Sequence, residues 1–185
     1  MSMIDIRRKN ALNLFREKSK FRDYDEFPVL RDEVDPQLHV SLNTVNQPFY
    51  LICEKDTVLA ALSGKAKVRF HDASVNYFDL EPGDFVYVPG GIPHRIECTE
   101  DALHLRYKAR IPGLEAVAWF CDNCGHEVDR HSWDNAKQPP QAGYLAGTKR
   151  FNEDAKRRVC AHCGVEHSPL DLERFRWEDV ANSLR

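Results

Sequence analysis

Residues 80–94 read LEPGDFVYVPGGIPH, and this stretch gives the strongest indication of the fold. Pro82 and Gly83 predict a tight turn, and the four residues FVYV that follow Asp84 are typical of a short β-strand. A Pro-Gly-Gly sequence at 89–91 predicts a second turn, and His94 comes shortly after it. The stretch therefore predicts one short strand between two turns, followed by a histidine.

The same alternation of short strands and polar turns extends on both sides. Residues 38–43 and 66–70 alternate apolar and polar side chains, and residues 58–62 form an apolar run. Residues 103–107 predict a last strand. Strands about ten residues apart, with polar turns between them, are typical of an all-β barrel or sandwich of the jelly-roll kind.

Both ends of the chain predict helices outside this β region. Residues 4–18 have the apolar spacing of a short amphipathic helix, and residues 171–185 suit an extra helix that covers the barrel or a partner subunit. The chain then divides into an N-terminal helical segment (1–37), a barrel (38–112), a cysteine module (113–170) and the C-terminal helix.

Four cysteines in two CxxC pairs predict a metal site in the cysteine module: Cys121, Cys124, Cys160 and Cys163. A glycine follows each pair, which allows the tight turn of a metal knuckle. Four thiolates fill a tetrahedron, so the predicted site is structural and binds zinc, or iron as in rubredoxin. The alternative is two disulfides. The first residues do not resemble a signal peptide, so we expect a reducing, cytoplasmic location that favours the metal.

Composition argues against several classes of partner. The net charge is -3 and the isoelectric point is near 6.2, which gives no electrostatic case for binding nucleic acid. No apolar stretch approaches the roughly 20 residues that span a bilayer. We therefore expect neither a nucleic-acid nor a membrane partner.

The order of these features resembles a known family. Residues 80–94 look like the second motif of the cupins, in which a histidine after the Pro-Gly turn binds a metal inside the barrel. With residues 119–126 and 156–164, which carry the CxxC pairs, the chain resembles bacterial 3-hydroxyanthranilate 3,4-dioxygenase up to about Pro169. The resemblance implies a cupin barrel, a homodimer, and a ferrous ion that opens the ring of an aminophenol.

Most of the iron ligands implied by the resemblance are missing. The family holds iron with two histidines and a glutamate, and these positions correspond here to Leu51, Thr57 and His94. Leucine cannot coordinate a metal, and one imidazole with one hydroxyl falls short of the usual triad for Fe(II). Only His94 of the three ligands remains.

The implied substrate residues have changed as well. The two arginines of the family correspond to Gln47 and Cys98, and its substrate glutamate corresponds to Arg106. Replacing a glutamate by an arginine reverses the local charge, so Arg106 would repel an amine and attract an anion. The resemblance therefore favours the fold more strongly than the reaction.

Several pocket residues are candidates for a replacement site. His104 lies two positions before Arg106, so both would point into the barrel. A second metal site with soft ligands, suited to zinc or iron, could consist of Cys53, His94, Cys98 and His104. The candidate catalytic residues are these four together with Arg106. The alternative is that both cysteines are small buried hydrophobes and both histidines are hydrogen-bonded core residues.

Three functions compete for this sequence. The first is a divergent cupin enzyme that acts on a small aromatic or amino-acid-derived substrate with altered pocket chemistry. The second is a retained Fe(II)-dependent ring-opening dioxygenase. The third is a non-catalytic cupin that binds a small molecule or regulates. All three have a small-molecule partner, and fold alone does not choose among them.

Overall fold

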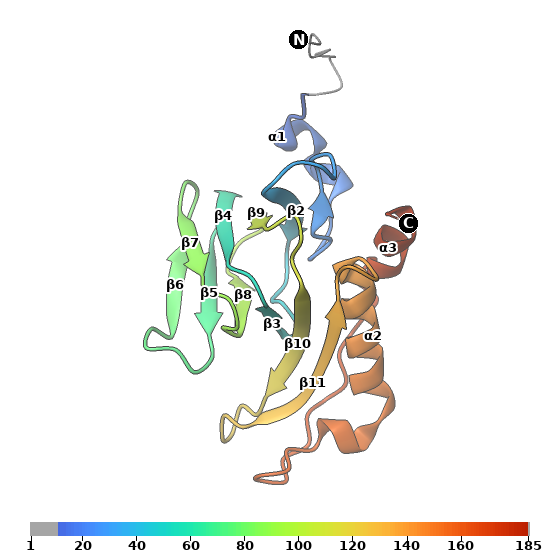
Figure 1. Cartoon of the computed structure of the whole chain (residues 1–185). Coiled ribbons are helices and arrows are strands. Elements are labelled where there is room, and N and C mark those ends of the chain that lie inside the picture. The colour runs from blue at the N-terminus through green and yellow to red at the C-terminus, as the bar shows by residue number, and fades with distance from the viewer. Residues whose placement is uncertain (1–10, 185) are drawn as a thin grey trace.

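The computed structural model describes residues 11–184 as two packed antiparallel sheets with few helices (Figure 1). The first sheet has the order β1 (Phe27–Pro28), β2 (Gln37–Asn43), β9 (Ala102–Lys108), β4 (Thr57–Ser63), β7 (Phe85–Val88). The second has the order β11 (Glu127–Asp134), β10 (Leu114–Phe120), β3 (Tyr50–Cys53), β8 (His94–Cys98), β5 (Ala66–Phe70), β6 (Tyr77–Leu80).

Most consecutive strands between β2 and β10 alternate between the two sheets. Strands β2, β4, β7 and β9 belong to the first sheet, and β3, β5, β6, β8 and β10 belong to the second. This crossing makes the jelly roll, because each amphipathic strand buries its apolar face against the opposite sheet. The predicted cupin-type barrel is confirmed, and the strand predicted between the two turns is β7.

The predicted division of the chain does not coincide with the sheets. Strand β10 begins at Leu114, beyond the expected end of the barrel, yet it pairs with β3 from Glu115↔Cys53 to Ala118↔Tyr50. Strand β1 lies within the segment expected to be helical and pairs with β2. These long-range ladders join the N-terminal segment and the cysteine module to the barrel.

Within the described residues, the two predicted terminal helices are present only in part. Residues 4–10 of the first one lie outside the described residues, and the described part contains helix α1 (Leu14–Glu17) and the 3-10 turn η2 (Lys18–Lys20). At the other end the helix is α3 (Trp177–Ser183). None of the described helices is long and apolar enough to cross a membrane.

Helix α2 (Pro140–Glu153) was not predicted, and it covers the part of the second sheet that extends beyond the barrel. It runs beside β11 and is followed by the 3-10 turn η3 (Ala155–Arg158) (Figure 1). A Cβ atom at Gly143 would lie 2.2 Å from the Trp133 ring, and one at Gly147 would lie 2.5 Å from Val117. The two glycines therefore allow the helix backbone to approach the sheet closely.

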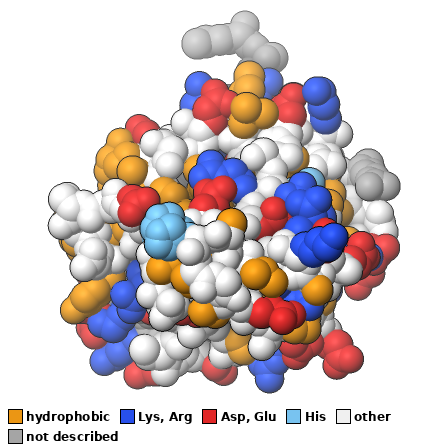
Figure 2. All heavy atoms as spheres, turned by 90° about the horizontal axis from the view of Figure 1, so that it is seen from below, with side chains coloured by type: hydrophobic (Ala, Val, Ile, Leu, Met, Phe, Trp, Pro, Cys, Tyr) orange, Lys and Arg blue, Asp and Glu red, His pale blue; other side chains and the backbone are white. Residues whose placement is uncertain are grey.

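Two apolar cores flank the first sheet. The larger one lies between the sheets and continues under α2 and α3 through an aromatic cluster of Phe49, Trp119, Tyr144 and Trp177. The smaller one lies where the N-terminal segment packs on β2, β4 and β9. On the surface in Figure 2, basic and acidic side chains are interspersed, in keeping with the small net charge.

Candidate functional site

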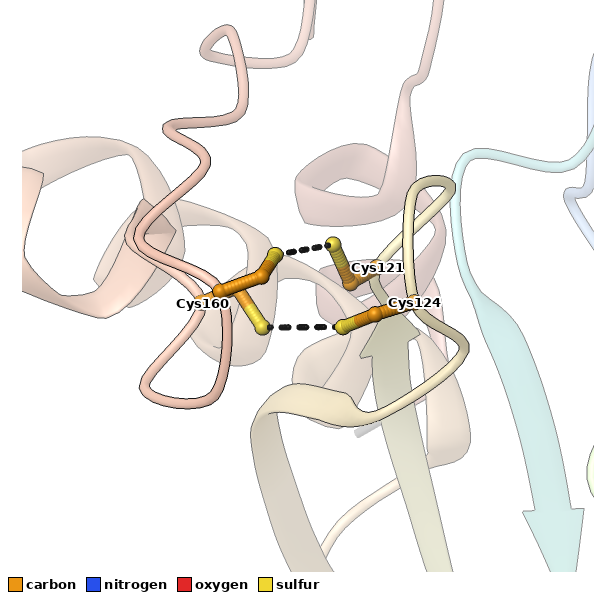
Figure 3. A group of neighbouring side chains, drawn as sticks. Cys121, Cys124 and Cys160 are labelled. Atoms are coloured by element: carbon orange, nitrogen blue, oxygen red, sulfur yellow. Dashed lines mark hydrogen bonds between the residues drawn. The ribbon is translucent and has the colours of Figure 1, made fainter.

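The four cysteines of the two CxxC pairs come together at one end of the molecule. Cys121 and Cys124 lie between β10 and β11, and their loop faces the loop that carries Cys160 (Figure 3). The sulfur atoms of Cys121 and Cys163 are 3.5 Å apart, and those of Cys124 and Cys160 are also 3.5 Å apart. All four sulfur atoms lie within 4.8 Å of one another.

These separations fit a metal better than disulfides. A disulfide needs sulfurs about 2.05 Å apart. Four sulfurs placed about 2.3 Å from a central zinc are about 3.8 Å apart, close to the observed arrangement. The four cysteines could therefore hold one metal ion, and with every coordination position taken by thiolate that ion would be structural.

The backbone of the two knuckles is alike. The Gly125 N–H donates to the carbonyl of Cys121 at 2.7 Å, and the Gly164 N–H donates to that of Cys160 at 2.8 Å. Both glycines have φ of 75°, where a side chain would be strained.

The barrel interior contains Arg106 of β9, which is almost wholly buried. Its Nε donates to Glu26 Oε1 at 2.6 Å, and its Nη1 donates to His94 Nε2 at 2.6 Å. Glu26 immediately precedes β1 and is buried as well. The guanidinium therefore bridges the histidine of the cupin motif and a carboxylate from the N-terminal segment.

This contact fixes the protonation of His94. Arginine remains protonated in proteins, so His94 Nε2 accepts the hydrogen bond and the ring proton resides on Nδ1, which lies 3.1 Å from the carbonyl of Ile92. Burial, followed by the charge of Arg106, lowers the pKa of His94 to about 3. His94 Nε2 therefore already accepts a hydrogen bond from the positively charged guanidinium of Arg106.

A second buried cation extends the network. Lys108 Nζ lies 3.1 Å from Glu26 Oε2 and 2.9 Å from Glu115 Oε1, and the Tyr144 hydroxyl donates to Glu26 Oε2 at 2.8 Å. Burial by itself raises the pKa of Glu26, but Arg106 and Lys108 together hold it well below its usual value. The negative charges of Glu26 and Glu115 therefore balance the positive charges of Arg106 and Lys108 inside the barrel.

The structure does not assemble the predicted replacement metal site. Among the described residues, groups of three or more nearby metal-binding side chains occur at the four cysteines and at Cys124 with His126 and His162. His94 and Cys98 lie four residues apart on β8, which places their backbones about 13 Å apart. The separation along the strand therefore rules out a shared ion, a conclusion that the spacing alone could have given.

The other candidates have separate surroundings. Cys53 is buried on β3, and burial strongly raises the pKa of its thiol. The Cys98 sulfur lies 3.7 Å from the Tyr24 hydroxyl, and burial raises the pKa of that thiol to about 11. His104 Nδ1 accepts from Asn43 Nδ2 at 2.8 Å. Of the five candidate catalytic residues, hydrogen bonding joins only His94 and Arg106 directly in the described chain.

Sequence reasoning missed Glu26, Lys108, Glu115 and Tyr144. Lys108 lies two residues after Arg106 on one strand, so its position on the same face was predictable. Glu26 gave no such signal, since it lies outside the predicted strands and reaches Arg106 across 80 residues.

The barrel has little free interior volume. A cavity of about 10 Å³ lies inside, and a cavity of about 220 Å³ opens at the end where Lys108, Glu115 and His39 lie. Larger hollows of about 620 and 330 Å³ lie beside the cysteine loops, away from the barrel interior. The interior as it stands has no room for a substrate, and the 220 Å³ cavity forms the barrel mouth.

Comparisons with known proteins agree with this cupin-type jelly roll. The family model described as "JmjC domain" matches residues 53–117. The chain is 30% identical over 105 residues to a 3-hydroxyanthranilate 3,4-dioxygenase of Bacillus cereus (strain ATCC 10987 / NRS 248), covering 54% of this chain and 55% of that protein. It is 32% identical over 91 residues to that of Bacillus thuringiensis (strain Al Hakam), covering 46% and 48%. The predicted resemblance is confirmed, and the chain spans about half the length of these relatives.

The chain also has a partial likeness to two solved structures. A hydroquinone 1,2-dioxygenase in complex with Cd²⁺ and 4-hydroxybenzonitrile has a TM-score of 0.48 at 16% identity, covering 58% of this chain and 78% of that one. A cupin-2 domain protein from Shewanella frigidimarina has a TM-score of 0.46 at 16% identity, covering 53% and 93%.

Proposed function

We propose that this chain is a dioxygenase-like cupin that has exchanged its barrel metal for a buried ion-pair network, and that it is a non-catalytic binding or regulatory module. The observation that carries the proposal is the 2.6 Å contact between Arg106 Nη1 and His94 Nε2. The one remaining histidine of the motif binds an internal cation at the nitrogen that a metal would need.

Binding Fe(II) at His94 would require Arg106 to leave. Glu26 would then lose its closest charge partner in a buried setting, and breaking a buried ion pair costs about 3–5 kcal/mol. Leu51 and Thr57 offer no imidazole or carboxylate in return. The energetic balance therefore favours the ion pair over the metal.

The barrel mouth is the proposed site for a small-molecule partner. Its cavity of about 220 Å³ is the size of a small metabolite, whereas the interior cavity of about 10 Å³ is not. Barrel mouths are common places for ligands in all-β folds. Lys108, Glu115 and His39 are among the polar residues that line this cavity.

Metal content and turnover test the proposal together. The purified chain is incubated anaerobically with Fe(II), desalted and analysed for metals, and then mixed with 3-hydroxyanthranilate in air. We expect about one metal ion per chain, at the four cysteines, and no absorbance of a ring-opened product. A second ion per chain with product formation would establish the retained dioxygenase instead.

A divergent enzyme is the second candidate, because titratable groups converge at the mouth. Burial lowers the pKa of Lys108, but the charges of Glu115 and Glu26 outweigh burial and leave it above its usual value; burial lowers the pKa of His39 to about 4. Mass spectrometry of small aromatic acids and amino acids incubated with the chain tests this. A product that forms with the wild type and not with Lys108→Met would favour the enzyme.

We propose zinc for the four-cysteine site and a homodimer for the assembly. Elemental analysis of the purified chain decides between zinc and iron.

Phe85 and Tyr87 on the edge strand β7 are 66% and 57% exposed and offer a surface for the second copy in the proposed homodimer. Sedimentation equilibrium should give a dimer for the wild type and a smaller species for Phe85→Lys. A wild-type monomer would refute the dimer.

A further inference from the structure

A small cavity lies inside the barrel beside the ion-pair network. It measures about 10 Å³, and its walls come from β2, β4, β8, β9 and the segment before β1. His104 and Arg106 both line it, and each is at least 97% buried, with exposed fractions of 3% and 2%. Nε2 of His104 and Nη2 of Arg106 have no hydrogen-bond partner among the described side chains and backbone.

The proton on His104 can be placed from its neighbours. The Tyr24 backbone N–H donates to Asn43 Oδ1 at 2.9 Å, which fixes the orientation of that amide. Asn43 Nδ2 must then donate to His104 Nδ1, at 2.8 Å. Because a neutral imidazole carries one proton, Nε2 is the protonated nitrogen and a donor.

The imidazole of His104 is uncharged near neutral pH. Burial, with a further contribution from Arg106, lowers the pKa of His104 to about 4. Arg106 Nη2 also bears only donor protons. Two buried donors therefore line one cavity and require an acceptor, because leaving each donor unpaired costs about 1–3 kcal/mol.

Size and charge decide what the acceptor is. A cavity of roughly 10–15 Å³ on this measure holds one water molecule. Arg106 and Lys108 are matched by Glu26 and Glu115, so no net positive charge remains to hold an anion in place. Ser41 also lines the cavity and supplies a hydroxyl to a water that has protons to donate.

We propose that this cavity holds a single water molecule that accepts hydrogen bonds from His104 Nε2 and Arg106 Nη2. The water completes the contacts of the guanidinium, whose Nε is bound to Glu26 and whose Nη1 is bound to His94. Arg106 is thereby bound at all three of its guanidinium nitrogens inside the barrel. The site is independent of any ligand at the barrel mouth.

A crystal structure of the full chain at high resolution, with a parallel bromide soak, tests the occupant. The expected result is one density peak about 3 Å from both nitrogens, with no anomalous signal from bromine. A cavity without density would overturn the proposal. Bromine at the site would overturn it too, since the acceptor would then be an anion.

The proton assignment has its own test in solution. Nitrogen-15 NMR of the histidine rings should show the Nε2–H tautomer for His104. His39 and His94 are internal controls, because their Nδ1 atoms face the backbone carbonyls of Glu26 and Ile92, so they should show the opposite tautomer. An Nδ1–H tautomer at His104 would remove one of the two donors and refute the proposal.

Discussion

At the residue scale, Arg106 acts as a built-in cation in the barrel. The charge reversal at this position predicted attraction of an anion, and the anion that Arg106 binds is Glu26 of the same chain. His94 keeps the place that the cupin motif gives it and contacts a guanidinium. A fixed positive charge from Arg106 thus joins this histidine to Glu26 inside the barrel.

Replacing Arg106 should destabilise the protein strongly. Arg106→Met leaves Glu26 with less compensation in a buried site, so we expect a loss of about 3–5 kcal/mol in the free energy of unfolding, measured by urea denaturation. Arg95→Met is the matched control, because the Arg95–Glu97 pair is partly exposed and should lose about 1 kcal/mol or less. Similar losses for both variants would contradict the buried network.

The buried histidines predict a pH dependence. The pKa values of His39, His94 and His104 are lowered by burial to about 4, 3 and 4. Such a group binds fewer protons folded than unfolded, so its contribution to stability is complete above the unfolded pKa of about 6.5 and is lost as pH falls toward 4.

Unfolding measured from pH 8 to pH 4 checks this sign. The free energy of unfolding should be nearly constant between pH 8 and 7 and should decrease as the pH is lowered further. His39→Gln should decline less steeply than the wild type below pH 6.5, and comparing the two cancels any loss of metal at low pH. Equal slopes would show that His39 titrates normally in the folded protein.

At the element scale, helix α2 depends on close packing against the second sheet. It carries two glycines in its interior, which are unfavourable for a helix by about 1 kcal/mol each. Both positions face the sheet at distances that exclude a side chain. The tertiary contact therefore outweighs the helix propensity, and this explains why the helix was not predicted.

Gly143→Ala should reduce stability in spite of the better helix propensity. The new Cβ would lie 2.2 Å from the Trp133 ring, and overpacking of this kind typically costs about 1–3 kcal/mol. Ala146→Gly on the exposed side of the same helix is the control and should lose about 1 kcal/mol through propensity alone. A Gly143→Ala protein that is more stable than the wild type would disprove the close approach.

At the scale of the whole molecule, the four cysteines tie distant segments together. One knuckle joins β10 to β11, and the other follows α2 and η3. A structural metal at such a site contributes about 10 kcal/mol or more to local folding in small zinc peptides. The ion would therefore hold the C-terminal region against the six-stranded sheet.

Loss of one ligand should remove the metal and loosen this region. Cys163→Ser is expected to contain well under one metal ion per chain and to be cut faster by protease in the segment 155–170. Cys98→Ser is the control, since Cys98 lies in the barrel, and it should keep one ion and the wild-type rate. Unchanged metal content in Cys163→Ser would exclude that cysteine as a ligand.

The jelly-roll class and the four-cysteine site could both be predicted from the amino-acid sequence. Both follow from local patterns: strand alternation punctuated by Pro-Gly turns around residues 80–94, and cysteine spacing within each knuckle. The sequence also indicated that His94 had lost its partners. The present surroundings of His94 could not be predicted, because Glu26 meets Arg106 through the packing of a segment 80 residues away. The partner of a buried charge depends on strand order and register, which no local pattern specifies.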